Sequence, residues 1–326
     1  MSHVPKLHDL TDETESLSDV VITGLQKPVK ELPSKLLYDE RGSLLFDQIT
    51  RLGEYYPTRT ETAIMRTHID EMVALIGPGS MIIEYGSGSS EKSQILLDHL
   101  EAPAAYVPID ISREHLVRSA VRIAKRYPQL EILPVCADYN EDLEIPNSKK
   151  PVARRVVYYP GSSIGNFHSD EAVDFLRRIA AIDGFGGGLL IGVDLQKDPE
   201  ILHAAYNDRE GVTAEFNLNL LERLNRELGS NFRIDRFRHR AIYNRDAMRV
   251  EMHLISLDNQ RVRIDDADIP FSKGETIWTE SSYKYTVEGF AALAERGGFE
   301  VEKVWIDGQR LFSVQYLSVP GADGAQ

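Results

Sequence analysis

The chain has 326 residues, of which 42% are hydrophobic, and 37 basic against 51 acidic residues give a formal net charge of −14 at pH 7. This length allows one large domain or two modest ones, each with a sizeable core. An acidic chain without a long basic run is not expected to take nucleic acid or an anionic membrane as its main partner. No apolar stretch reaches the roughly 18 residues of a membrane-spanning helix. The N-terminus lacks the order of a signal peptide, so we expect a cytoplasmic protein.

The single cysteine and the spacing of the histidines argue against several kinds of chemistry. Cys136 is alone, which excludes a disulfide framework and a cysteine-based metal site. Because it ends an apolar strand pattern, we expect a small buried hydrophobic residue rather than a nucleophile. The histidines lack H-x-x-x-H and H-E-x-x-H spacing, and the G-x-S-x-G at residues 161–165 is a short pattern that does not by itself define a catalytic serine. We therefore expect no metal and no serine-hydrolase mechanism.

Helical and strand patterns alternate from about residue 60 to residue 195. In chain order, the predicted elements are a helix over 60–76, a strand over 81–84, a helix over 92–100, a strand over 105–109, a helix over 113–127, strands over 130–136 and 155–159, a helix over 171–182 and a strand over 189–193. Strands that alternate with helices predict right-handed crossovers and a parallel sheet.

The pattern changes after Asp194. Two helical segments follow within 197–230, and residues 232–270 are predicted to form antiparallel strands, including one over 249–257. The earlier pattern then returns, with a helix over 286–296 and strands over 299–306 and 311–319.

A final hairpin on a mostly parallel sheet is typical of class I methyltransferases that use S-adenosylmethionine (SAM). We therefore expect a Rossmann-like α/β domain with a seven-stranded, mostly parallel sheet and an antiparallel final strand, plus a smaller α+β domain that binds the substrate. The methyltransferase domain is expected over 60–196 and 286–326, and the substrate-binding domain over 1–59 and 197–285.

A glycine-rich turn carries the clearest chemical signal. A β-branched run ends at Glu84, and Gly86, Ser87 and Gly88 follow it before a polar helix start. Glycines in such a turn let the backbone approach a ligand above the end of a strand. One strand–helix unit later, the next predicted strand ends in Asp110, an acid that can bind a ribose diol.

The residues around this turn favour SAM over a dinucleotide. A dinucleotide fingerprint needs a third glycine and a helix N-terminus that accepts pyrophosphate. Here Glu91 stands at the third glycine position, and its charge would repel a phosphate. SAM carries a cationic sulfonium and no phosphate, so acids near the loop do not oppose its binding. A glycine-rich turn with no ligand is the alternative for this motif taken alone.

Four further segments make a specific resemblance. Residues 38–47 read YDERGSLLFD, 54–61 read EYYPTRTE, 161–166 read GSSIGN and 279–284 read TESSYK. With the Gly86 loop, these motifs resemble the histidine Nα-methyltransferases of ergothioneine biosynthesis, and they span nearly the whole chain in the expected order. The resemblance implies that SAM donates three methyl groups to the α-amino group of L-histidine and gives hercynine.

The resemblance also implies how SAM is bound. Gly86 with its neighbours Ser87 and Gly88 would lie against the methionine end of SAM, and Lys92 near its carboxylate. Asp110 would bind the ribose hydroxyls. Asp138 and Tyr139 would bind the adenine; the family often has Phe where Tyr139 stands, and this departure keeps an aromatic edge and adds a hydroxyl. Taken alone, Lys92 would be a solvated surface lysine.

The same resemblance implies a site for the amino acid. Asn166 and Tyr206 would donate to its carboxylate, and Tyr38 and Tyr56 would line the pocket. Without the resemblance, Asn166 would be a turn or cap residue, and Tyr206 and Tyr56 would be ordinary packing residues.

The imidazole ring needs partners for both of its nitrogens. By resemblance, Glu280 accepts one ring N–H, Ser282 meets the other nitrogen, and Met252 forms a wall of the ring pocket. Glu280 and Ser282 are two residues apart, so on a strand they point the same way. A solvated acid at a strand end is the alternative for Glu280 alone.

Methyl transfer requires a deprotonated amine aligned with the methyl group, and room for a growing quaternary centre. Gly161, followed by Ser162 and Ser163, supplies small residues for that space. With the roles that the resemblance implies, we expect Tyr38, Gly161 and Asn166 to act closest to the reacting amine.

Other functions remain open at this point. The substrate could be another amino acid, such as tryptophan or tyrosine. A nicotinamide dehydrogenase would share the sheet, but Glu91 and the final hairpin argue against it. A SAM-binding module without activity is opposed by the set of Asn166, Tyr206 and Glu280. The sequence is compatible with a monomer.

Overall fold

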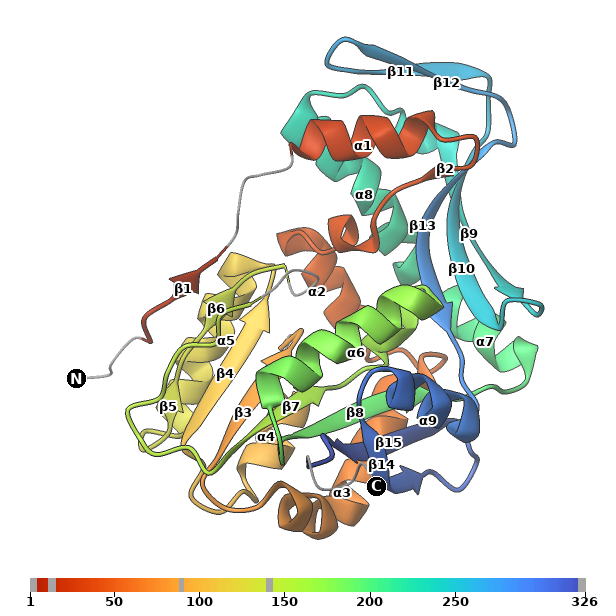
Figure 1. Ribbon diagram of the computed structural model, residues 1–326. Helices are drawn as coiled ribbons and strands as arrows, with labels where there is room; N and C mark the ends of the chain where they lie inside the picture. Colours follow the sequence, from red (N-terminus) through yellow and green to blue (C-terminus); the bar gives the residue numbers. More distant parts are fainter. Residues whose placement is uncertain (1–4, 11–15, 88–90, 139–142, 322–326) are drawn as a thin grey trace. The chain divides into compact units, whose positions relative to one another are not determined.

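The computed structural model describes residues 5–10, 16–87, 91–138 and 143–321. The chain divides into two compact units (Figure 1). The first unit contains the described residues of Met1–Thr11, Pro57–Gln196 and Lys284–Gln326. The second contains those of Asp12–Tyr56 and Lys197–Tyr283.

The first unit is built on a nine-stranded sheet. Its order is β1-β6-β4-β3-β7-β8-β15-β14, with β5 paired to β4. The strands are β1 (His8–Asp9), β3 (Ser80–Tyr85), β4 (Ala105–Asp110), β5 (Glu131–Ile132), β6 (Val135–Cys136), β7 (Arg154–Tyr159), β8 (Gly188–Asp194), β14 (Glu300–Ile306) and β15 (Phe312–Ser318). Only β15 pairs antiparallel, with β8 and with β14; the other pairings are parallel. This order confirms the predicted class I methyltransferase fold.

Two short strands enlarge the sheet beyond the predicted seven. The strand predicted over 130–136 is divided into β5 and β6, and Pro134, which has no N–H for a ladder, lies between them. At the sheet edge, β1 pairs parallel with β6. The assignment of all of residues 1–59 to the second domain was therefore wrong for His8 and Asp9, because the open edge of β6 offers them backbone partners.

Helices cover both faces of this sheet. They are α3 (Tyr56–Ile76), α4 (Glu91–Leu97), α5 (Arg113–Arg126), α6 (Ser169–Asp183) and α9 (Val287–Arg296), with the 3₁₀ turn η2 (Ser163–Asn166). Successive strand residues alternate between two apolar clusters, because a strand points its side chains to opposite faces. Ile83 and Leu189 pack with apolar residues of α6 and α9, whereas Ile82 and Leu190 pack with those of α3, α4 and α5.

The second unit is a smaller α+β structure, as the sequence predicted. It contains a four-stranded sheet in the order β2-β13-β10-β9 and a separate β11–β12 hairpin. Its elements are α1 (Leu17–Gln26), β2 (Lys30–Glu31), η1 (Ser34–Leu37), α2 (Glu40–Ile49), α7 (Pro199–Tyr206), α8 (Val212–Leu228), η3 (Ile234–Arg236), β9 (Phe237–Asn244), β10 (Arg249–Ser256), β11 (Gln260–Ile264), β12 (Ala267–Phe271) and β13 (Thr276–Tyr283). The apolar stripe of α8, which includes Phe216, Leu220 and Leu224, is buried. That the second unit binds substrate stays a prediction.

The two segments of the first unit that precede and follow residues 197–283 are joined to each other. Leu195 and Tyr285 form a parallel bridge. The Gln196 N–H donates to the Tyr285 carbonyl at 2.9 Å, and the Tyr285 N–H donates to the Asp194 carbonyl at 3.0 Å. An ion pair of 2.8 Å between Lys284 Nζ and Asp194 Oδ2 reinforces the junction, and both side chains are 1% exposed.

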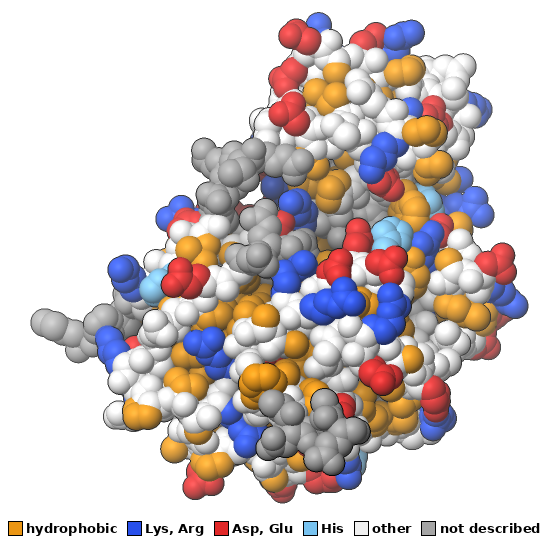
Figure 2. Space-filling view, in the orientation of Figure 1, with side chains coloured by type: hydrophobic (Ala, Val, Ile, Leu, Met, Phe, Trp, Pro, Cys, Tyr) orange, Lys and Arg blue, Asp and Glu red, His pale blue; other side chains and the backbone are white. Residues whose placement is uncertain are grey.

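The surface shows charges of both signs. On the face in Figure 2, acidic and basic side chains are interspersed among polar and apolar ones. Among the residues that the structure describes, no helix combines the length and the apolar character needed to cross a membrane.

A buried carboxylate fixes the start of the glycine-rich turn. Glu84, the fifth residue of β3, accepts hydrogen bonds from Ser93 Oγ of α4 at 2.8 Å and from the Tyr106 hydroxyl of β4 at 2.6 Å. It therefore ties together the strand before the turn, the helix after it and the neighbouring strand. Burial raises the pKa of Glu84 to about 7, so the folded protein holds a proton there that a solvated carboxyl would release.

Glu84→Gln should change how stability depends on pH. The folded pKa of about 7 exceeds the ordinary value of 4.5, so the stabilisation from this group is fully present below pH 4.5 and is lost as pH rises to 7. Glutamine resembles the neutral form and does not titrate. The free energy of unfolding of the parent, minus that of the variant, should fall by about 3 kcal/mol over this range. Urea unfolding at several pH values measures it; a constant difference would contradict the assignment.

Candidate functional site

Predicted cofactor residues lie at the carboxyl ends of three neighbouring strands. Gly86 follows β3, Asp110 ends β4, and Asp138 follows β6 two residues after Cys136. Since these strands are adjacent and parallel, their carboxyl ends share one edge of the sheet. Gly88 and Tyr139 lie outside the described residues. Cys136 is buried, as expected, and burial raises the pKa of its thiol to about 11, which disfavours the thiolate form.

The turn after β3 begins with a glycine in the left-handed region. Gly86 has a φ of +68°, a conformation that disfavours other residues, and its N–H donates to the Ile109 carbonyl at 2.9 Å. Among the residues that the structure describes, a methyl group built on Gly86 would meet no atom within 4 Å. Beside it, Asp110 Oδ1 accepts the Ser112 N–H at 2.9 Å. A glycine at this position, next to strand-end carboxylates, suits the methionine and ribose parts of SAM.

A second buried carboxylate joins a predicted cofactor residue to a predicted catalytic one. Lys92, in α4, places its Nζ 2.5 Å from Glu61 Oε2. The Gly161 N–H lies 3.1 and 3.0 Å from the two carboxylate oxygens of Glu61. Glu61 is completely buried. Lys92 is therefore no solvated surface lysine; its ammonium is fixed beside the turn that follows β7.

The turn after β7 is held in an uncommon conformation. Gly161 has a φ of +80° and Ser162 one of 59°. Ser162 Oγ accepts the Asp194 N–H of β8 at 2.9 Å, which stabilises this conformation. The turn leads into η2, and Asn166, its last residue, is half-buried.

In the second unit, one face of the four-stranded sheet gathers predicted substrate residues. Met252 of β10 pairs with Glu280 of β13, and Val250 pairs with Ser282, so these four side chains share a face. The prediction that Glu280 and Ser282 point the same way is confirmed. The Tyr206 hydroxyl, at the end of α7, donates to Ser282 Oγ at 2.8 Å.

A buried polar network fixes that face. Asn217 of α8 is completely buried; its Nδ2 donates to His239 Nδ1 at 2.9 Å, and its Oδ1 accepts from Thr279 Oγ1 at 2.7 Å. His239 Nε2 then donates to the Tyr206 carbonyl at 2.9 Å. Burial lowers the pKa of His239, which favours the neutral ring that can accept from Asn217. The network connects the strand that carries Glu280 to the helix that carries Tyr206.

The predicted pocket tyrosines have aromatic or cationic neighbours within the second unit. The Tyr38 ring lies 5.6 Å from the Phe46 ring and 5.4 Å from the Phe216 ring. Lys197 Nζ lies 4.5 Å from the centre of the Tyr56 ring.

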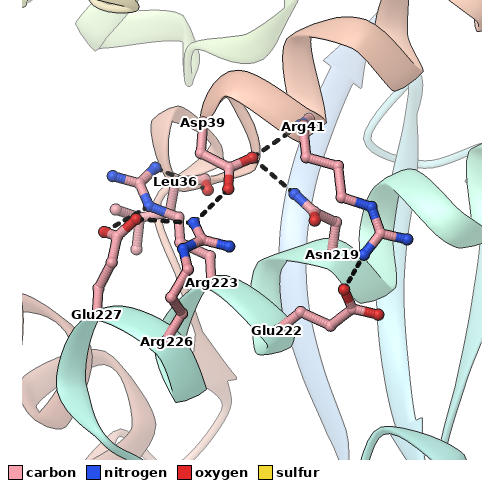
Figure 3. A network of polar contacts seen from close by, with 9 residues as sticks. Leu36, Asp39, Arg41, Asn219, Glu222, Arg223, Arg226 and Glu227 are labelled. Atoms are coloured by element: carbon pink, nitrogen blue, oxygen red, sulfur yellow. Dashed lines mark hydrogen bonds and ion pairs between the residues drawn. The ribbon is translucent and has the colours of Figure 1, made fainter.

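The YDERG segment is explained by the residue after Tyr38. Asp39 caps α2 by accepting the Gly42 N–H at 2.7 Å. It also accepts from Asn219 Nδ2 at 2.7 Å and from Arg226 Nη2 at 2.6 Å, both on α8 (Figure 3). Burial opposes its charge, but these hydrogen bonds outweigh burial and lower the pKa of Asp39. Asp39 thereby fixes the backbone that carries Tyr38.

Ion pairs and backbone contacts extend this connection between η1, α2 and α8. Arg41 pairs with Glu222, and Arg223 Nη1 donates to the Leu36 carbonyl at 3.0 Å (Figure 3). Arg226 also reaches Glu227 at 3.0 Å.

Sequence reasoning gave no role to several residues that hold this machinery in place. Glu61 is the last residue of the EYYPTRTE segment that carries the resemblance. Its place in that segment was the available signal. Asn217 and His239 lie far in sequence from Tyr206 and Glu280, so only the folded chain shows that they connect them. Among the described residues, no group of three or more His, Cys, Asp or Glu side chains is arranged to hold a metal ion.

The sheet order, together with the glycine turn and the strand-end acids, defines the class of protein as a SAM-dependent methyltransferase. Residues 17–319 match the model of the family described as "Histidine-specific methyltransferase, SAM-dependent". The chain belongs to this family.

Similar proteins agree with this assignment. The chain is 42% identical over 299 residues to "Histidine N-alpha-methyltransferase" of Mycolicibacterium smegmatis, covering 90% of this chain and 92% of that protein. It is 41% identical over 293 residues to the protein of the same name from Mycobacterium tuberculosis, covering 88% and 90%. "Ergothioneine biosynthesis protein 1" of Neurospora crassa is 32% identical over 292 residues, which cover 82% of this chain and 33% of that longer protein.

Gly42→Ala should destabilise the protein. A methyl group on Gly42 would lie 1.8 Å from the Leu37 carbonyl oxygen, so η1 or α2 must shift. We expect a loss of about 2–4 kcal/mol in the free energy of unfolding. Gly53→Ala is the control, because a methyl group there meets no described atom within 4 Å. Urea unfolding of both variants checks this; equal losses would contradict the steric argument.

Asp110→Ala should weaken SAM binding by about 1–3 kcal/mol through loss of charge-assisted hydrogen bonds to the ribose. The side chain also accepts the Ser112 N–H, so some loss of thermal stability is expected. Asp110→Asn keeps an acceptor for Ser112 and separates the two effects: it should be nearly as stable as the parent and still bind SAM less tightly. Calorimetry measures both affinities. Unchanged SAM affinity in both variants would refute the ribose assignment.

Proposed function

We propose that the protein transfers three methyl groups from SAM to the α-amino nitrogen of L-histidine and forms hercynine, a step of ergothioneine biosynthesis. One observation supports the choice of ring most directly. Glu280 and Ser282 share a sheet face with Met252, and Tyr206 contacts Ser282. A carboxylate and a hydroxyl can satisfy the two unlike nitrogens of imidazole, one as an N–H donor and the other as an acceptor.

The chemistry asks the protein mainly for alignment and for proton removal. SAM supplies an electrophilic methyl group on a cationic sulfur. In each transfer the nitrogen lone pair forms the new N–C bond while the C–S bond breaks, and a neutral thioether leaves. The amine must lose a proton before each of the three transfers, and the final quaternary nitrogen carries none. The nitrogen gains one methyl group in each transfer, so the site needs enough space for the final trimethylammonium group.

The turn after β7 suits that requirement. Gly161 has no side chain, and a methyl group built on it would lie 3.6 Å from Lys92 Nζ and 3.7 Å from Ser163 Oγ. Larger residues would fill this volume. We propose that Gly161 borders the growing ammonium centre, with Tyr38 among the residues that act closest to it.

The amino-acid carboxylate needs donors that do not form a permanent ion pair. Asn166 and Tyr206 are proposed for this role, because an amide N–H and a phenol O–H donate without carrying charge. The O–H that Tyr206 donates to Ser282 in the structure would then turn to the substrate carboxylate. Tyr56 and Met252 are proposed to complete the pocket wall. For SAM, we propose that Gly86, Ser87 and Lys92 bind the methionine end, Asp110 the ribose and Asp138 the adenine.

Product analysis tests the function directly. The purified protein is incubated with SAM and, separately, with each standard amino acid, and the products are examined by mass spectrometry. We expect mass steps of one, two and three methyl groups on histidine alone. Successive steps on tryptophan or tyrosine instead would replace histidine as the substrate, and no methylation of any amino acid would refute the proposal.

We also propose that the enzyme works in the cytoplasm, where SAM and free histidine are both available, and that it is a monomer. Light scattering during size-exclusion chromatography gives the oligomeric state, and a dimer mass would contradict the second point.

Replacing the proposed ring-reading residues should change substrate preference. Glu280→Ala removes the acceptor for an imidazole N–H and should weaken the binding of histidine by about 1–3 kcal/mol. Adding Met252→Val widens the same face, so the double variant should shift toward tryptophan. Competition between histidine and tryptophan, followed by product mass, measures the ratio.

Ser281→Ala is the control for this experiment. Ser281 pairs with Glu251, so it points to the opposite face of the same strand. It should leave the ratio unchanged. A double variant with the parental histidine-to-tryptophan ratio would refute the role of Glu280.

A further inference from the structure

The completely buried carboxylate of Glu61 has no role in the proposed reaction so far. It lies in α3, yet its partners belong to two other parts of the first unit: Lys92 in α4 and the Gly161 amide after β7. Gly192 of β8 is its neighbour on a third side, because a methyl group built there would lie 2.2 Å from Glu61 Oε1. The absence of a side chain at Gly192 thus leaves room for this carboxylate between α4, β8 and the turn after β7.

These contacts place the positive charge of Lys92 close to the turn at which we propose that the amine reacts with SAM. Lys92 Nζ would lie 3.6 Å from a methyl group built on Gly161, so the ammonium is next to the turn proposed to border the reacting amine. The Lys92 side chain is only 18% exposed, so water screens it poorly. An unbalanced ammonium there would repel the cationic sulfonium of SAM, whereas the neutral thioether product would feel no such repulsion.

We propose that Glu61 is a positioning residue that neutralises Lys92 and thereby sets the preference of the site for SAM over the product S-adenosylhomocysteine (SAH). The Glu61 carboxylate contacts both the Lys92 ammonium and the Gly161 amide, and so fixes the position of one relative to the other. The inference rests on the proposed function, since it assumes that SAM binds beside this turn.

The neighbouring acid does not replace Glu61 in this role. Glu84 is electrostatically coupled to both Lys92 and Glu61, but its oxygens accept from Ser93 and Tyr106. In the described structure, Lys92 makes its ion pair with Glu61. Glu61 is therefore the direct partner of the ammonium.

The test compares the affinities of SAM and SAH, measured by calorimetry, for the full chain and its variants. Glu61→Gln keeps an oxygen that can accept from Gly161 or Lys92 but removes the charge. We expect the dissociation constant of SAM to rise about tenfold more than that of SAH. Both ligands carry the same carboxylate, ribose and adenine, so damage to the fold or to those contacts changes both affinities alike and leaves their ratio unchanged.

Two further variants keep the test decisive. Combining Glu61→Gln with Lys92→Met removes both charges and should return the ratio toward that of the parent. Glu61→Met removes the same charge and should shift the ratio in the same direction as Glu61→Gln, against SAM; this variant decides if Glu61→Gln does not fold. Equal weakening of SAM and SAH binding in Glu61→Gln, or a double variant that keeps the shifted ratio of Glu61→Gln, would overturn the inference.

The parent protein separates this inference from the proposed function. A parent that methylates histidine, with variants that do not change the ratio, would leave the function standing and refute the role of Glu61. A parent that binds neither SAM nor SAH would refute the proposed function itself.

Discussion

Backbone amides at the carboxyl ends of parallel strands run out of ladder partners, and each must find another acceptor. In the first unit, Gly86 donates to the carbonyl of Ile109 on the next strand, Gly161 donates to the Glu61 carboxylate, and Asp194 donates to Ser162 Oγ. The turns that bring these amides to their acceptors have left-handed backbone at Gly86 and Gly161. The shape of the edge at which we place SAM follows from how those three amides are satisfied.

Buried acids are costly unless they are paired or protonated, and this protein uses both routes. Glu61 and Asp194 are each paired with a lysine, whereas burial raises the pKa of Glu84 to about 7 and its oxygens accept from two hydroxyls. The two routes have different consequences. A paired carboxylate holds a charge in a fixed place, but Glu84 can gain or lose its proton near neutral pH while still connecting β3, β4 and α4.

Periodicity and turn chemistry predicted the fold well, because alternating strands and helices leave few possible topologies. Pro134, which divides one expected strand, and the two-residue strand at His8 were missed, since such short pairings depend on an available edge rather than on a pattern. For the site, the two-residue spacing of Glu280 and Ser282 was sufficient to place them on one face. The Asn217–His239 connection and the pairing of Glu61 with Lys92 could not be predicted, because they join residues from separate elements through tertiary packing alone.

The bridge between Leu195 and Tyr285 bears on how such a chain could have arisen. Residues 197–283 leave and re-enter the first unit at adjacent points. For the large sheet, this whole segment is equivalent to one surface loop whose ends are already held together, and the entropy of closing a loop grows only slowly with its length. Sequence of very different length could therefore be exchanged at this position during evolution while β8, β15 and the turns beside them stayed intact. The same large sheet could in this way be combined with second units of different structure.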